Sequence, residues 1–414
     1  MGRSKLIGPS AWIVGVAGLV IGAISVWLVT QGNPGNMGLC IACFTRDIAG
    51  VFGGADFNLG ATAYLRPEIM GLILVAGVTA MGFKEFKPRG GSSTILRFFL
   101  GFIFMVAALI FLGCTVRAWM RLGAGDLNAL WGVAGIVVGV VVGVFFLKRG
   151  FNLGRATRMS GGSRVIGLVP LAVVAALLVL ALALDSGATS ANLTVTPKGG
   201  KSTAESAVFV GEEVKKPEGA TLQDGAIVAA DGTVVSSAES VAAAKPMPGG
   251  SRAPLIISLL AGGVMGLVAQ RSRFCTVGGI RDVLLVRRFD LLFGVIGVLI
   301  GVFVVSNAFG TFKLGFEGQP VAHTVAAANF FAMVIAALAA VLLGGCPLRQ
   351  MIMSAEGDYD AGVAVLGMFF GALFAHYFKI NGSGAGVNPQ AWYALVVMGA
   401  LLLGLGFWKS SAKA

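Results

Sequence analysis

Ten apolar runs constrain this chain more than any other feature of its sequence. A helix needs roughly 20 consecutive apolar residues to cross the hydrocarbon core of a bilayer. Of the 414 residues, 56% are hydrophobic and only 12% are charged, a balance that a soluble domain could not bury. The sequence therefore predicts an all-α polytopic membrane protein with about ten transmembrane helices, at 11–30, 64–83, 95–113, 129–147, 164–184, 254–270, 290–309, 324–345, 360–378 and 391–408.

Five of the runs precede residue 185 and five follow residue 253, so the chain has two membrane halves. Because five is odd, the second half enters from the opposite side of the membrane. We predict an N-terminal membrane repeat at 1–184 and an inverted C-terminal repeat at 254–414, with short broken or re-entrant helices in each. The polar interval 185–253 is expected to be a flexible extracytoplasmic loop, in which two short apolar runs around Asp231-Gly232 indicate a β-hairpin.

Basic residues predict the orientation, because cytoplasmic loops of membrane proteins carry an excess of Lys and Arg. Clusters follow the second, fourth and sixth runs, and two lysines close the chain. All fall on one side if both termini are cytoplasmic. The net charge of +12 is explained by this rule and requires no nucleic-acid partner. The residues are Lys84, Lys87, Arg89, Arg97, Lys148, Arg149, Arg155, Arg158, Arg164, Arg271, Arg273, Arg281, Arg287, Arg288, Lys409 and Lys413.

A first cysteine motif occurs once in each half. Cys40 and Cys275 are each followed, six and seven residues later, by an Arg-Asp pair. The N-terminal copy has a further cysteine, Cys43, where the C-terminal copy has Gly278. Ionisable residues near apolar spans are costly unless they are paired. The pairs are therefore either structural ion pairs that hold a re-entrant segment or basic elements that attract an anion. They are Arg46 with Asp47 and Arg281 with Asp282.

A second motif, Gly-Cys-x-x-Arg, places Cys114 and Arg117 in one half and Cys346 and Arg349 in the other. If helical, each arginine lies about one turn beyond its cysteine on the same face. Two interpretations stay open: the arginines guide an anion, or they extend their charged ends to the membrane interface. Asp126 and Asp358 also match between the halves and are expected to cap the next helix.

The matched thiols predict a symmetric transport path. Breaks in membrane helices are tolerated where protein or a water-filled path covers them, and helix N-termini attract anions. A thiol is soft and only a weak hydrogen-bond donor, which favours a sulfur- or selenium-containing anion over sulfate or phosphate. The alternative is thiolate chemistry, in which a cysteine forms a transient sulfur or selenium adduct. Nothing in the sequence indicates a cofactor, a metal site or an ATP-binding loop, so we do not expect an enzyme.

Several motifs resemble those of the YeeE/YedE family of bacterial inner-membrane proteins. These are Ser272-Arg273-Phe274-Cys275 through Arg281-Asp282, and Gly344-Gly345-Cys346-Pro347-Leu348-Arg349. The family is associated with thiosulfate uptake along a path in which cysteines relay the anion. Asn33 to Gly38, Cys43 to Asp47 and Arg66-Pro67-Glu68-Ile69 look more like the branch of YedE-related selenium metabolism proteins. The resemblance implies relay roles for Cys114, Cys275 and Cys346; the internal repeat adds Cys40, and the branch adds Cys43.

Together, motifs and resemblance imply a bacterial inner-membrane permease that imports a small sulfur or selenium anion, with selenium metabolism as the expected destination. Cys40 and Cys114 would belong to the outer half of the path, and Cys275 and Cys346 to the inner half. Thiosulfate uptake for cysteine synthesis is the first alternative. A membrane sulfur- or selenium-transfer protein without transport is the second, and a scaffold for a cytoplasmic carrier protein is the third.

Overall fold

The structure, a computed structural model, describes residues 6–8, 10–53, 64–185, 208–210, 213–215, 221–223, 226–228, 234–236 and 252–411. In the N-terminal half the helices are α1 (Ala11–Thr30), α2 (Ile41–Phe52), α3 (Pro67–Gly82), α4 (Thr94–Ile110), α5 (Thr115–Gly123), α6 (Ala129–Lys148), the 3-10 helix η2 (Gly161–Leu168) and α7 (Val169–Asp185). In the C-terminal half they are α9 (Leu255–Ser272), α10 (Thr276–Val286), α11 (Asp290–Ala308), α12 (Ala326–Leu343), α13 (Pro347–Ala355), α14 (Tyr359–Tyr377) and α15 (Pro389–Ser411).

Nine stretches of helix in the described part of the chain are long and apolar enough to cross a membrane. The tenth predicted span is α3, which is shorter, with 16 residues. Three of the nine stretches join a long helix to a short one: Thr94–Gly123, Leu255–Val286 and Ala326–Ala355. Each joint contains one cysteine of the repeated motifs. The predicted class, an all-α polytopic membrane protein, is confirmed.

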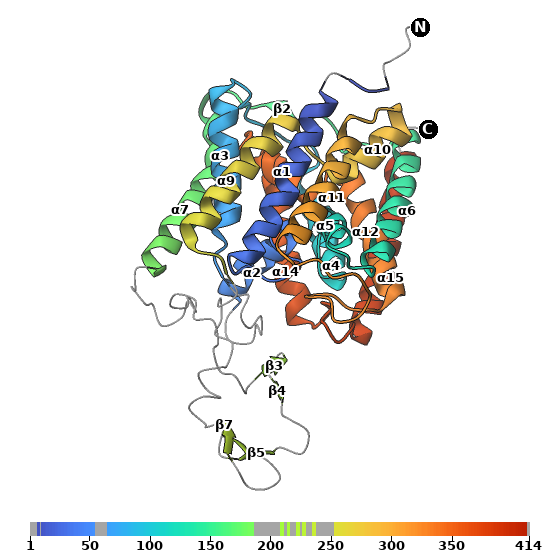
Figure 1. Cartoon of the computed structure of the whole chain (residues 1–414). Helices are drawn as coiled ribbons and strands as arrows, with labels where there is room; N and C mark the ends of the chain where they lie inside the picture. The colour runs from blue at the N-terminus through green and yellow to red at the C-terminus, as the bar shows by residue number, and fades with distance from the viewer. Residues whose placement is uncertain are drawn as a thin grey trace.

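The two halves run in opposite directions. In Figure 1, α1 begins at the upper end of the bundle, where α9 and α15 finish, whereas α7 ends and α9 begins at the lower end. We call these the terminal end and the insertion end. The helix pairs with the most extensive contacts are α1 with α11, α3 with α9, α4 with α14 and α6 with α12. If each helix of the first half is exchanged with its equivalent in the second, this set of pairs maps onto itself, as an inverted repeat requires.

Glycines allow these helices to pack backbone against backbone. A Cβ atom on Gly18 of α1 would lie 1.9 Å from the carbonyl oxygen of Gly294 in α11. A Cβ atom on Gly101 of α4 would lie 2.2 Å from the carbonyl oxygen of Ala364 in α14. Any larger residue would push these helices apart. Close packing through small residues is how membrane helices associate where lipid supplies no hydrophobic drive, and it accounts for part of the high glycine content.

The fifth helix of each half breaks the symmetry. α7 packs on α3 and α13, whereas α15 packs on α12, α4 and α6. The remaining strands are short: β1 (Arg89–Gly90) pairs with β2 (Thr157–Arg158), β3 (Val208–Val210) with β4 (Glu213–Lys215), and β6 (Ala226–Val228) with both β5 (Thr221–Gln223) and β7 (Val234–Ser236). β6 and β7 flank the turn predicted at Asp231-Gly232; the turn itself and most of 185–253 lie outside the described residues.

Several of the basic clusters meet at the terminal end. Arg89 pairs with Arg158 across the β1–β2 ladder. Glu85, which follows α3, is 3.4 Å from Arg271 at the end of α9 and accepts a hydrogen bond from Gln270 at 2.6 Å. That hydrogen bond and the two nearby arginines lower the pKa of Glu85. The loops after α3, α6 and α9 therefore lie together, as the positive-inside pattern predicted for one face of the membrane.

Candidate functional site

Four cysteines occupy the same kind of position: each is the N-cap residue of a short helix. They are Cys40 before α2, Cys114 before α5, Cys275 before α10 and Cys346 before α13. The Cys40 thiol accepts the Cys43 amide at 3.3 Å, and the Cys275 thiol accepts the Gly278 amide at 3.2 Å. The first cysteine of each half thus caps its own helix, while the thiols of Cys114 and Cys346 make no capping bond. A thiol replaces the usual Ser or Asp at all four ends.

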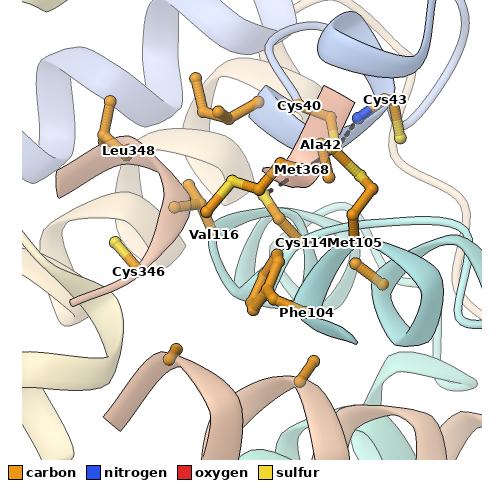
Figure 2. Packing of buried hydrophobic residues seen from close by; sticks show 14 of the residues in the cluster. Cys40, Ala42, Cys43, Phe104, Met105, Cys114, Val116, Cys346, Leu348 and Met368 are labelled. Atoms are coloured by element: carbon orange, nitrogen blue, oxygen red, sulfur yellow. Dashed lines mark hydrogen bonds between the residues drawn. The ribbon is translucent and has the colours of Figure 1, made fainter. Parts of the chain in front are cut away.

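The cysteines pair within each half. The sulfur atoms of Cys40 and Cys114 are 3.9 Å apart, and the Cys346 amide donates to the Cys275 sulfur at 3.3 Å. All five cysteines are free and buried, with no more than 4% of any of them exposed. Figure 2 draws Cys346 apart from the group of Cys40, Cys43 and Cys114, with apolar side chains between them. The fold therefore brings together Cys40 with Cys114 and Cys275 with Cys346; which pair faces outward stays a prediction.

One polar contact joins the two pairs. The hydroxyl oxygens of Thr115, the first residue of α5, and Thr276, the first residue of α10, are 2.9 Å apart. Contacts therefore run from Cys40 to Cys114, across this threonine pair, and on from Cys275 to Cys346. These threonines lie outside the repeated residues of the cysteine motifs. Their signal is positional, because each directly follows a motif cysteine.

Arg117 is the most unusual charge at the site. It is fully buried, and no carboxylate of the described residues lies within ion-pair distance. Its guanidinium donates to the carbonyl oxygens of Asn36 at 2.7 Å, Val321 at 3.0 Å and Leu112, and to the Cys43 sulfur at 3.3 Å. It does not extend to the membrane interface. A buried cation without a countercharge is costly, and a bound anion would remove that cost.

Arg117 also provides a hydrogen-bond donor for a backbone carbonyl oxygen at the break between α4 and α5. The last turn of a helix leaves carbonyl oxygens without partners, which is costly inside a membrane. Here the Leu109 oxygen accepts the Gly382 amide at 3.0 Å, the Phe111 oxygen accepts Arg121 at 3.0 Å, and the Leu112 oxygen accepts Arg117. The Ile110 oxygen lies 2.9 Å from Nε2 of His323, which donates to it. The break is therefore held by buried polar side chains.

The equivalent arginine in the other half is neutralised. Arg349 makes two bonds of 3.2 Å to the carboxylate of Glu356. The carbonyl oxygen of Leu343, at the break between α12 and α13, accepts Arg97 instead, at 3.0 Å. The Gly-Cys-x-x-Arg motif itself has a steric explanation. A Cβ atom on Gly113 would lie 2.7 Å from Arg117 Cδ, and one on Gly345 would lie 3.1 Å from Arg349 Cγ.

The two Arg-Asp pairs also differ in their surroundings. Asp47 accepts from Arg46 and, at 2.7 Å, from Arg66, and all three side chains are buried. Arg66 and Glu68 extend this network through Asn33, whose amide donates to Glu68 at 2.7 Å and whose oxygen accepts the Ala253 amide at 2.8 Å. Arg281 and Asp282 form only a partly exposed pair at 2.9 Å. The structure thus places Arg46 and Asp47 in a network that ties α2 and α3 to the start of α9.

The predicted caps are half right. Asp358 is the N-cap of α14 and accepts the Ala361 amide at 3.0 Å. Asp126 is not the N-cap of α6, because that position is held by Asn128. Instead, Asp126 accepts the Asn128 amide at 3.0 Å and pairs with the buried Arg121 at 2.6 Å. The buried arginine draws the carboxylate away from the helix end.

A small cavity of about 40 Å³ adjoins this region. Its lining comes from α1, α5, α11 and the loops at their insertion end, and includes Ser25, Asn36, Ser306 and Thr311. The backbone oxygen of Asn36 is one of the acceptors of Arg117. The cavity therefore places polar groups of the insertion end beside Asn36, whose backbone oxygen accepts a hydrogen bond from the buried Arg117 side chain.

The fold and the site define the class of the protein: a polytopic α-helical membrane protein built of two inverted halves, with a buried cysteine as the N-cap residue of each of four short helices. No model of a known protein family and no curated protein matched the chain.

Proposed function

We propose that this protein is a permease of the bacterial inner membrane that imports a small inorganic sulfur- or selenium-containing anion. The observation that carries the proposal is that four short helices each have a cysteine as N-cap residue, and that contacts link these four cysteine-bearing ends across the two inverted halves. Helix N-termini supply amide hydrogens and partial positive charge, and thiols supply soft, weak contacts from which a solute can leave. Discontinuous helices of this kind form the substrate sites of many transporters.

The distribution of charge supports an anion and a direction. Arg117, on the side of the loops at the insertion end, has no carboxylate partner among the described residues, whereas Arg349 is paired with Glu356. An anion would be attracted first to the Cys40, Cys43 and Cys114 group and would then pass to Cys275 and Cys346, where the arginine is neutralised. If the insertion end faces outward, as the basic residues at the other end indicate, this is import.

The choice between selenium and sulfur rests on Cys43. This thiol has no counterpart in the C-terminal half, and it is the only thiol in the described structure that accepts a hydrogen bond from a guanidinium. A second soft group beside the cation favours an anion that contains a soft sulfur or selenium atom, and Cys43 is the thiol that the resemblance to the selenium-metabolism branch adds. Selenium metabolism is therefore the proposed destination, with thiosulfate uptake as the alternative substrate. The non-transporting roles, sulfur or selenium transfer and a scaffold for a carrier protein, have no comparable observation in their favour.

The decisive experiment is flux into liposomes that contain the purified protein. Thiosulfate, selenite and sulfate are supplied side by side, with protein-free liposomes as the control. We expect entry of selenite or thiosulfate well above the control and little entry of sulfate. Selective thiosulfate entry would establish the sulfur alternative, and absence of flux for all three would favour the non-transporting roles. Cys114→Ala, Cys275→Ala and Cys346→Ala, each correctly inserted, should lose uptake; if all three keep wild-type rates, the cysteine path is wrong.

A further inference from the structure

The threonine pair lies where a solute would have to cross from one half to the other. Thr115 and Thr276 are fully buried, and their hydroxyl–hydroxyl contact is the only side-chain hydrogen bond that either makes in the described structure. Two hydroxyls carry two hydrogens, and their mutual bond uses one. One buried hydroxyl hydrogen of the pair therefore remains without an acceptor among the described residues.

The threonine contact has no polar equivalent at the matching positions of the inverted repeat. Thr276 follows Cys275 as Ile41 follows Cys40, and Thr115 follows Cys114 as Pro347 follows Cys346. The helices equivalent to α5 and α10, namely α13 and α2, are also in contact, and the residues at the equivalent positions are Pro347 and Ile41, which carry no side-chain donor. Among the residues that directly follow the four motif cysteines, only Thr115 and Thr276 carry a hydroxyl, so this polar contact exists on the α5–α10 side alone.

We infer that the hydroxyls of Thr115 and Thr276 form the transfer site of the path, where they donate to the oxygen atoms of an oxyanion as it moves between the two cysteine pairs. The inference rests on the proposed function and assigns to this site an oxygen-bearing anion such as selenite or thiosulfate. As the solute arrives, the hydroxyls exchange their mutual bond for bonds to it. Because such an exchange loses little hydrogen-bonding energy, the passage has a low barrier. Without a solute, the closed pair separates the two halves.

A structural hydroxyl pair and a donor pair predict different outcomes in variants. Thr115→Val or Thr276→Val leaves the other hydroxyl buried without its partner, so either role predicts a defect. In the double variant Thr115→Val/Thr276→Val, no hydroxyl is orphaned. A purely structural pair should then recover, because replacing both partners by apolar groups of the same shape is nearly neutral. A donor pair should remain impaired.

The test measures initial uptake of selenite and thiosulfate into liposomes for the wild type, both single Val variants, the double Val variant and both Thr→Ser variants. We expect the Val variants and the double variant to lose roughly three- to tenfold in maximal rate, with little change in KM, and the Ser variants to stay near wild type. Recovery of the double variant, or wild-type rates in all Val variants, would overturn the inference. Flux in the wild type and its loss in Cys114→Ala, measured in parallel, distinguish this failure from a failure of the proposed function.

Discussion

The guanidinium of Arg117 donates to the sulfur of Cys43 at 3.3 Å, with no carboxylate of the described residues within ion-pair distance. The equivalent arginine of the other half, Arg349, faces the carboxylate of Glu356. Two copies of one motif thus have different charged partners. In the proposed permease, this difference would distinguish a capture side from a release side.

The charge difference predicts unequal effects of removing the two arginines. Arg117→Gln should raise the KM for uptake about 10- to 100-fold, the range expected for one charge-assisted hydrogen bond. Arg117→Lys should recover only part of this, because an ammonium cannot reproduce the planar fork of donors. Arg349→Gln should change KM little. The measurement is uptake as a function of solute concentration.

Arg121→Gln is the matched control for Arg117. Arg121 is equally buried and also donates to a carbonyl at the α4–α5 break, but it bonds to Asp126 rather than to a thiol. The Arg121→Gln variant should have a lower free energy of unfolding without a selective rise in the KM for uptake. If Arg117→Gln and Arg121→Gln raise KM equally, Arg117 has only a structural role.

The glycines before Cys114 and Cys346 should differ in tolerance. In Gly113→Ala the new methyl group would lie 2.7 Å from Arg117 Cδ, and that side chain is held by four hydrogen bonds. We expect a loss of about 1–3 kcal/mol, as for overpacked sites. Gly345→Ala approaches Arg349 Cγ at 3.1 Å, and that partly exposed side chain can shift, so the loss should be smaller. Thermal unfolding of both variants in detergent measures the difference; equal melting temperatures would contradict it.

The network around Asp47 should contribute much more to the free energy of unfolding than the equivalent Arg281–Asp282 pair. Asp47→Asn leaves the buried Arg46 and Arg66 without their shared carboxylate. Removal of one partner from a buried ion pair costs about 3–5 kcal/mol. Asp282→Asn affects a partly exposed pair, for which about 0–1 kcal/mol is expected. The unfolding midpoints of the two variants test this prediction. An Asp282→Asn variant as unstable as Asp47→Asn would refute the larger structural role of Asp47.

The orientation can be tested by labelling with a maleimide that does not cross membranes. The five native cysteines are buried, so the background should be low. Glu317→Cys, in the exposed loop between α11 and α12 at the insertion end, should be labelled from outside intact cells. Lys87→Cys, exposed at the terminal end, should be labelled only after the membrane is opened. The reverse pattern would place the termini outside and would turn the proposed import into export.

The sequence by itself determined the class of fold, because apolar runs of bilayer length leave a chain few alternatives to membrane-spanning helices. The repeated spacing around the cysteines also indicated which thiols would be grouped. Two inverted halves meet at a shared interface, so matching residues near the axis that relates the halves come together there.

Only the tertiary structure decided what surrounds each matched residue. Arg117 and Arg349 share a motif, but Glu356 lies beside one and Cys43 beside the other. Arg66 joins Asp47 to a network that Asp282 lacks, and Arg121 draws Asp126 away from its expected cap. Thr115 and Thr276 come from separate halves and meet only because α5 and α10 approach each other. Such contacts lie far apart in the sequence, and burial, which makes each of them costly or stabilising, is a property of the packed chain.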